Sequence, residues 1–105
     1  MDVFFLLLFG HALGDFALQS TTMQQHKDPK KDPEAWYYYL TAHSIIHGGF
    51  VGFFTGSFLL SILETASHWI IDYFYSEGKL TMHIDQGLHI LCKVIWIVML
   101  MRGIA

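Results

Sequence analysis

The sequence predicts an all-α protein, a four-helix antiparallel transmembrane bundle formed by a single domain over residues 1–105. Three observations support this prediction. Hydrophobic residues make up 53% of the chain and charged residues only 14%, whereas a soluble domain carries roughly 25% charged residues. Residues 35–63 contain no formal charge. Four apolar segments also carry polar side chains four residues apart, a spacing that places them on one helix face.

The first expected helix covers about residues 3–19, which begin with VFFLLLFG. As a helix it extends roughly 25 Å, which is short for a bilayer but acceptable. No basic region precedes this segment and no small-residue cleavage pattern follows it, so we do not expect a cleaved signal peptide. Residues 20–34 are the polar stretch of the chain, and their two Asp-Pro steps indicate a loop.

Residues 35–63 would form a helix of roughly 43 Å, which exceeds the hydrocarbon core of about 30 Å. We therefore expect two helices, at about 36–54 and 58–75, with a tight turn at Thr55-Gly56-Ser57. The sequence Ser-Glu-Gly-Lys at 76–79 would end the third helix. The fourth helix is expected at about 84–101.

The positions of the lysines predict the orientation of the bundle in the membrane. With four spans, the loops at 20–35 and 76–83 lie on one side and contain Lys27, Lys30, Lys31 and Lys79. The other side has only Arg102 and the N-terminal amine. We therefore expect a multi-pass protein with both loops in the cytoplasm and both termini outside.

Composition also excludes several classes of protein. The net charge of −3 offers no basic surface for a phosphate backbone, so nucleic acid is not an expected partner. The single cysteine, Cys92, excludes an internal disulfide framework and a CxxC zinc site. The absence of an HExxH motif argues against a zincin protease. The lipid bilayer is the expected partner, and the sequence leaves open whether the protein is a homo-oligomer.

The polar side chains of the four segments are predicted to meet at one level of the bundle. Each group lies in the half of its helix nearest the cytoplasm, and ionisable groups within a membrane face the bundle interior. We therefore expect the eight residues to share one cavity near the cytoplasmic end. They are His11, Asp15, His43, His47, His68, Asp72, Asp85 and His89.

These eight residues are candidate metal ligands. Neutral imidazole and carboxylate bind zinc, manganese and iron, and helix bundles hold one or two metals with inward-facing His, Asp and Glu side chains. We expect a divalent metal with Asp85 as its least certain ligand. The expected core of the site is His43, His68 and Asp72 with Asp15. Outer contacts with the site or its substrate are expected from Gln19, Gln86, Glu64 and Lys93.

A metal-dependent hydrolase is the leading functional hypothesis. The metal would lower the pKa of a bound water, and a carboxylate, Asp72 or Asp15, would act as the catalytic base. A site near the interface suits an amphiphilic substrate such as a phospholipid, a prenyl phosphate or an acyl ester. The lysines of the 20–35 loop would then accept an anionic head group.

Three alternatives are left open. In the first, the polar residues form an interhelical hydrogen-bond network without metal. In the second, they line a path for protons or divalent ions. In the third, the chain is an interaction protein whose partner lies outside this chain. The apolar outer halves of the helices disfavour a continuous path. An alternative for Lys93 is that its side chain extends to the membrane interface. His26 and His83 are expected in solvated loops.

Four motifs resemble the domain of unknown function 3307 family, which contains small bacterial and phage-associated membrane proteins. They are HALGDFALQ at 11–19, HSIIH at 43–47, HWIID at 68–72 and DQGLH at 85–89. The resemblance covers nearly the whole chain. It implies a polar site and a location in a bacterial or phage-encoded inner membrane, but no particular reaction. A weaker similarity, by analogy only, is to membrane-bound metal-dependent hydrolases, which also place His and Asp on transmembrane helices.

Overall fold

The computed structural model describes residues 2–105, and the regular structure within them is entirely helical. Helix α1 (Val3–Ala12) continues directly into a π-helical turn, η1 (Leu13–Ala17). A short helix, α2 (Thr21–His26), follows. Three long helices complete the chain: α3 (Trp36–Thr55), α4 (Phe58–Ser76) and α5 (Met82–Met101). The all-α prediction is therefore confirmed.

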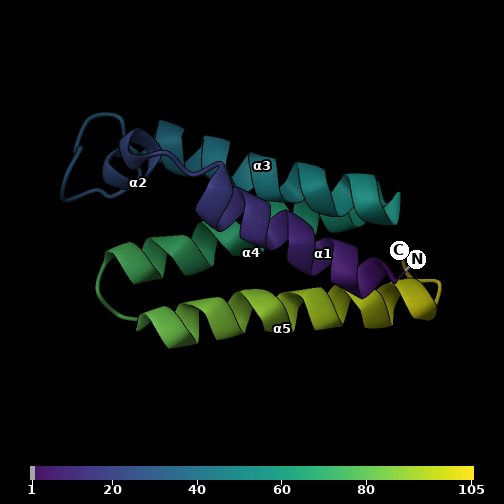
Figure 1. Cartoon of the computed structure of the whole chain (residues 1–105). Coiled ribbons are helices and arrows are strands. Elements are labelled where there is room, and N and C mark those ends of the chain that lie inside the picture. The colour runs from purple at the N-terminus through teal and green to yellow at the C-terminus, as the bar shows by residue number, and fades with distance from the viewer. Residues whose placement is uncertain (1) are drawn as a thin grey trace.

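The four long segments surround a common interior. The α1 helix packs against α3 and α5, and α4 packs against the same two helices from the opposite side. Both termini lie at one end of the bundle, whereas α2 and the α4–α5 connection lie at the other (Figure 1). The molecule measures 41 × 22 × 22 Å, so its long axis follows the helices.

The boundaries of the long helices follow from local signals in the sequence. The expected turn at residues 55–57 is present, and Gly56 occupies the left-handed region with φ of 71°, which glycine adopts without steric strain. Ser57 then caps α4 by accepting a hydrogen bond from the Leu60 amide at 3.2 Å. Thr81 caps α5 in the same way. Because α5 begins at Met82, His83 lies in its first turn rather than in the expected loop.

The polar segment 20–34 is more ordered than the sequence analysis predicted. Ser20 caps α2 by accepting a hydrogen bond from the Met23 amide at 3.1 Å. His26, expected to be solvated, places Nδ1 2.6 Å from Asp32 Oδ2 and stacks its ring on Tyr39. This hydrogen bond lowers the pKa of the Asp32 carboxyl. These contacts hold the loop against the start of α3.

The bundle buries polar side chains and exposes apolar ones. A small buried apolar cluster consists of Leu7, Val51, Leu60 and Trp96, and it lies in the parts of the helices that are nearer the termini than the polar residues are. The remaining buried interior is dominated by polar and charged side chains, while large hydrophobic side chains on every long helix face outward. Within the described residues, α5 is the helix long and apolar enough to cross a membrane, and Val3–Ala17 is apolar but shorter.

Glycine allows α3 and α4 to approach closely. A Cβ atom on Gly48 would overlap the Thr65 hydroxyl and lie 2.7 Å from the Ser61 carbonyl oxygen. The Ser61 hydroxyl also donates a hydrogen bond to the Gly48 carbonyl at 2.8 Å. A Cβ atom on neighbouring Gly49 would meet no atom within 4 Å. The contact between the two helices therefore requires the absence of a side chain at residue 48.

We predict opposite effects of alanine at these two neighbouring glycines. Gly48→Ala forces the helices apart and is expected to destabilise the protein by about 1–3 kcal/mol, as overpacking typically does. Gly49→Ala meets no atom and is expected to be neutral or to stabilise by up to about 1 kcal/mol, because alanine favours helix. Thermal unfolding of the purified variants measures both effects. Equal midpoints for the two variants would contradict the packing described.

Candidate metal centre

The structure brings all eight candidate residues together at one level of the bundle. Each of the four long segments supplies two of them, spaced four residues apart. All are buried except Asp15, whose side chain is 9% exposed. Every one of the eight has a ring nitrogen or carboxylate oxygen within 3.6 Å of another member. The pairs involve His11, Asp15, His43, His47, His68, Asp72, Asp85 and His89.

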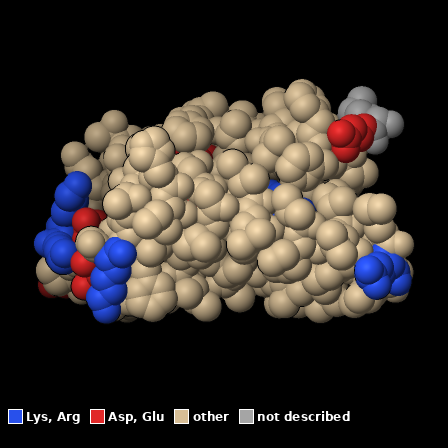
Figure 2. Space-filling model, turned by 90° about the horizontal axis from the view of Figure 1, so that it is seen from below, with Lys and Arg blue, Asp and Glu red and all other residues tan. Residues whose placement is uncertain are grey.

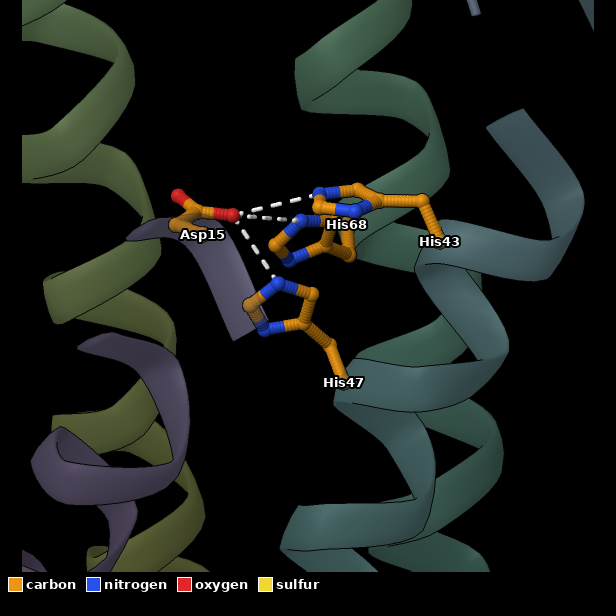
Figure 3. A group of neighbouring side chains, drawn as sticks. All are labelled: Asp15, His43, His47 and His68. Atoms are coloured by element: carbon orange, nitrogen blue, oxygen red, sulfur yellow. Dashed lines mark hydrogen bonds and ion pairs between the residues drawn. The ribbon is translucent and has the colours of Figure 1, made fainter. Parts of the chain in front are cut away.

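Asp15 lies at the centre of this cluster. Its Oδ1 atom is 3.2 Å from Nε2 of His43, 2.9 Å from Nε2 of His47 and 3.6 Å from Nε2 of His68. Figure 3 shows the three rings pointing toward this one oxygen. The histidines come from α3 and α4, so a single carboxylate oxygen joins the first segment to two other helices.

Local structure in the first segment places Asp15 at this point. Residues 13–17 form the π-helical turn, in which the Leu18 amide donates to the Leu13 carbonyl at 2.7 Å. Such turns widen a helix locally and occur often at functional sites. A Cβ atom on Gly14 would lie 2.7 Å from the His47 ring. Glycine at this position therefore allows His47 to approach the backbone beside Asp15.

Asp72 forms a second centre next to the same Nε2 atoms of His43 and His68. Its Oδ2 atom lies 3.3 Å from Nε2 of both His43 and His68, and 3.2 Å from Nζ of Lys27. Its Oδ1 atom lies 3.1 Å from Nε2 of His89. The four residues expected at the core of the site thus alternate in space, with His43 and His68 each between Asp15 and Asp72. Lys27 brings a positive charge from the loop beside α2.

The α5 helix completes the cluster. Nε2 of His89 is 3.5 Å from Oδ1 of Asp85. Gln86 bridges to the first segment: its amide nitrogen donates to Asp15 Oδ2 at 3.0 Å, and its amide oxygen is 2.9 Å from Nε2 of His11. Asp85, the ligand predicted with least certainty, pairs with His89. The predicted outer contact at Gln86 is present in the structure.

Several of these buried atoms lack a hydrogen-bond partner. Among the eight residues they are Nδ1 of His11, Nε2 of His47, Nε2 of His68, Oδ1 of Asp85 and Nδ1 of His89. For Nε2 of His47, Nε2 of His68 and Oδ1 of Asp85, oppositely charged atoms lie within 2.9–3.6 Å, but their distance or direction does not make a hydrogen bond. Buried polar atoms are nearly always paired. The unpaired atoms therefore mark where a further group would be accommodated.

A second buried polar layer lies on the side of the cluster nearer the termini. Oε1 of Glu64 accepts hydrogen bonds from Nζ of Lys93 at 2.8 Å and from Nε1 of Trp96 at 2.9 Å. Oε2 of Glu64 lies 3.1 Å from Nδ1 of His68. The alternative that Lys93 reaches the membrane interface is therefore wrong, because its side chain is 1% exposed and paired. The spacing from Glu64 to His68 was the sequence signal for this contact.

A cavity of about 260 Å³ leads to the cluster from the end of the bundle that carries α2. It is lined by carboxylates of the cluster, by amide side chains and Lys27, and by apolar side chains. The lining residues are Asp15, Phe16, Gln19, Gln24, Lys27, Asp72, Tyr75, Met82, Asp85 and Gln86. The expectation that a lysine of the 20–35 loop lies beside the site agrees with the position of Lys27.

Three compact groups of side chains have ligand atoms close enough to hold a metal ion. The first contains Asp15, His43, His47 and His68, and the second contains Asp15, Asp85 and His89. The third contains Glu64, His68 and His89. In the third group, Lys93, Trp96 and His68 already engage both oxygens of Glu64. The first two groups are therefore the better candidates, and they share Asp15.

The fold and the cluster define a helical-bundle protein with a buried His/Asp centre. A family model described as "Protein of unknown function (DUF3307)" matches residues 3–104. The chain therefore belongs to this family, which confirms the resemblance seen in the four motifs. Searches of curated proteins and of solved structures found no significant match. The family assignment carries no activity, so the function is argued from the site itself.

We predict that Lys93 is required to neutralise Glu64. Lys93→Met leaves a buried carboxylate without its cation and is expected to destabilise the protein by about 3–5 kcal/mol. Adding Glu64→Gln to this variant removes the uncompensated charge and is expected to restore most of the loss. Thermal unfolding of the single and double variants measures the difference. A double variant no more stable than Lys93→Met would show that the pair is not the source of the loss.

Proposed function

We propose that the protein is embedded in a membrane by all four long segments. The support is the inverted distribution of polarity, with charged groups inside and large hydrophobic side chains outside. On the face seen in Figure 2, charged residues gather at the two ends and the band between them is almost entirely uncharged. The long axis of 41 Å is close to the thickness of a bilayer with its head groups, about 40–45 Å.

The average hydropathy of each helix understates how apolar the outer surface of the bundle is. An average along α4 includes Glu64, His68 and Asp72, although all three side chains are buried between helices. The same applies to His43 and His47 of α3. Lipid would contact only the outward side chains, among them Ile45, Phe53, Phe58, Ile62 and Ile70, which are exposed and apolar. The outer surface therefore suits lipid better than the helix averages indicate.

The membrane proposal is tested by labelling from one side. In a Cys92→Ser background, Lys30→Cys and Lys79→Cys are expected to react with a membrane-impermeant maleimide from the same side, and Arg102→Cys from the other. The reason is that the loops and the termini lie at opposite ends of the bundle. Labelling in right-side-out and inverted vesicles makes the comparison. Opposite sidedness of residues 30 and 79 would overturn the four-span arrangement.

We further propose that the cluster binds a divalent metal ion. The observation that carries this proposal is the set of three Nε2 atoms around Oδ1 of Asp15, at 2.9–3.6 Å. Bonds of about 2.0–2.1 Å to a tetrahedral ion would separate neighbouring ligand atoms by about 3.3 Å. The three distances from Asp15 Oδ1 bracket this value, and the ligand atoms of all four residues lie within 4.8 Å of one another. Zinc, manganese and iron all accept this combination of donors.

The electrostatics of His68 support a cation at the same point. An ionised Glu64 only accepts hydrogen bonds, so Nδ1 of His68 donates to it. A neutral His68 then directs the lone pair of Nε2 toward carboxylate oxygens of both Asp15 and Asp72, at 3.6 and 3.3 Å. This arrangement is repulsive unless Nε2 carries a proton or a metal ion lies between the atoms. A metal ion satisfies it, and Glu64 orients the ligand in the manner common for metal-bound histidine.

The chemistry we propose is hydrolysis of an amphiphilic substrate. A bound divalent metal activates water for attack and polarises the bond to be broken. Asp72 lines the cavity and lies where it can accept a proton, and Asp15 is the second candidate for this role. Lys27 offers a positive charge at the cavity for an anionic head group. The apolar lining at Phe16, Tyr75 and Met82 would accept the first part of an acyl or prenyl chain.

We predict that metal binding depends on the histidines of the cluster. His43→Ala and His68→Ala are expected to weaken the affinity for Zn²⁺ or Mn²⁺ at least about tenfold, because each removes a ligand. His83→Ala is the matched control, since this histidine is exposed on the first turn of α5. Elemental analysis of the purified protein after equilibration with each metal measures binding. Wild-type protein without bound metal would overturn the proposal.

A hydrogen-bond network without metal is the second candidate. It is favoured by the direct N···O approaches between the histidines and the carboxylates, and a proton on His68 would also relieve its lone-pair repulsion. This reading expects variants such as His43→Ala to lose stability without any change in metal content. A continuous ion path is disfavoured, because the cluster of Leu7, Val51, Leu60 and Trp96 closes the bundle beyond Glu64.

A further inference from the structure

The two oxygens of Asp15 face two different sets of donors. Oδ1 faces the three histidines of α3 and α4 described above. Oδ2 faces the other side, 3.4 Å from Nε2 of His11 and 3.0 Å from the Gln86 amide nitrogen. A carboxylate with one oxygen on each of two donor sets has the geometry of a bridging ligand.

The two oxygens of Asp72 also face different sets of donors. Oδ2 lies 3.3 Å from Nε2 of His43 and of His68, which belong to the first set. Oδ1 lies 3.1 Å from Nε2 of His89, which is on α5. The two aspartates therefore lie between two groups of histidines, those of α3 and α4 and those of α1 and α5.

The second donor set contains an unsatisfied buried group. Oδ1 of Asp85 has no hydrogen-bond partner, although its side chain is only 5% exposed. It lies 3.5 Å from Nε2 of His89, and ligand atoms of Asp15, Asp85 and His89 all lie within 4.8 Å of one another. The His11 ring is 5.1 Å from the His89 ring between centroids. These groups surround a second point on the α5 side of Asp15.

We propose that the site holds two divalent metal ions bridged by Asp15 and Asp72. The first ion takes His43, His47 and His68. The second takes Asp85 and His89, whose ligand atoms are grouped with Asp15, and His11, whose Nε2 would exchange the Gln86 amide oxygen at 2.9 Å for the ion. This inference rests on the proposed metal-binding function and extends it to a dinuclear centre, in which Asp15 and Asp72 would act as bridging ligands in place of the role of catalytic base. Two-metal sites in hydrolytic enzymes place their ions about 3.5–4 Å apart, a distance that the two oxygens of one carboxylate can span.

Charge supports this assignment. Asp15, Asp72 and Asp85 contribute three negative charges, because Glu64 is already paired with Lys93. Two divalent ions then leave one positive charge, which a single hydroxide neutralises. Lys27 remains as an additional cation beside Asp72. A dinuclear centre of this kind would attract an anionic substrate rather than a cationic one.

The cavity is placed to serve the second ion. Asp15, Asp72 and Asp85 line it and the histidines of the two donor sets do not, so Asp85 is the lining residue that belongs to one donor set alone, the second. A ligand entering from the end that carries α2 therefore meets the bridging carboxylates and Asp85 first. The first ion would be enclosed by protein side chains, and the second would offer an open position toward the cavity. Open coordination positions are characteristic of catalytic metal ions.

The test is loading of the full-length, metal-free protein with Mn²⁺ alone, followed by elemental analysis and electron paramagnetic resonance. Wild type is expected to bind two ions per chain with an exchange-coupled signal. Asp85→Asn and His11→Gln, which act on the second position, are each expected to bind one ion with the signal of an isolated Mn²⁺. His47→Ala acts on the first position and is expected to do the same. His83→Ala should match wild type.

The outcomes separate this inference from the proposed function. One ion per wild-type chain with an isolated-ion signal overturns the dinuclear centre and leaves a mononuclear site intact. Two coupled ions in both Asp85→Asn and His11→Gln overturn the assignment of the second position. No bound Mn²⁺ in wild type, together with no bound Zn²⁺ after the equilibration described under the proposed function, overturns both proposals. Circular dichroism of each variant, compared with His83→Ala, distinguishes loss of a ligand from loss of the fold.

Discussion

A carboxylate buried between helices must be paired, because an isolated charge in a low-dielectric interior is too costly to retain. Asp15 meets this constraint through contacts with His43, His47 and His68, and through Gln86 on α5. One side chain thereby connects all four long segments at a single level. The π-helical turn and Gly14 give it the necessary position. The arrangement of the helices around this level follows from the need to surround that charge.

The interior of the bundle has two parts with different roles. Near the termini, Leu7, Val51, Leu60 and Trp96 form an apolar core. Toward the α2 end, the interior is a polar cluster reached by a cavity. The apolar part excludes water and closes one side of the polar part. The cavity described above opens at the end that carries α2, which fits the proposed binding of a molecule that enters from that end.

Glu64 and Lys93 lie where these two parts meet. Lys93 and Trp96 hold one oxygen of Glu64, and its other oxygen faces Nδ1 of His68. This pairing sets which nitrogen of His68 faces the cluster. The buried ion pair thus has a directional role in addition to neutralising charge, since it orients a histidine that contacts both Asp15 and Asp72. Such outer contacts commonly tune metal ligands.

Sequence alone determined the long helices and the side chains that meet between them. The uncharged segment 35–63 and the Thr55-Gly56-Ser57 turn predicted α3 and the start of α4, because length and turn chemistry are local properties. The spacing of four residues identified the inward faces, since helical periodicity requires no knowledge of neighbours. The short α2 was missed because the Asp-Pro steps indicated a loop, although Ser20 is a recognisable N-cap.

Tertiary structure decided which atoms of those side chains meet. The division of the Asp15 and Asp72 oxygens between two donor sets depends on how α1 and α5 rotate against α3 and α4, which periodicity does not specify. The burial of Lys93 depended on Glu64, which lies 29 residues away in the sequence. Helix faces are encoded locally. The pairing of charges across those faces is a property of packing, because it depends on distances between segments that are remote in the chain.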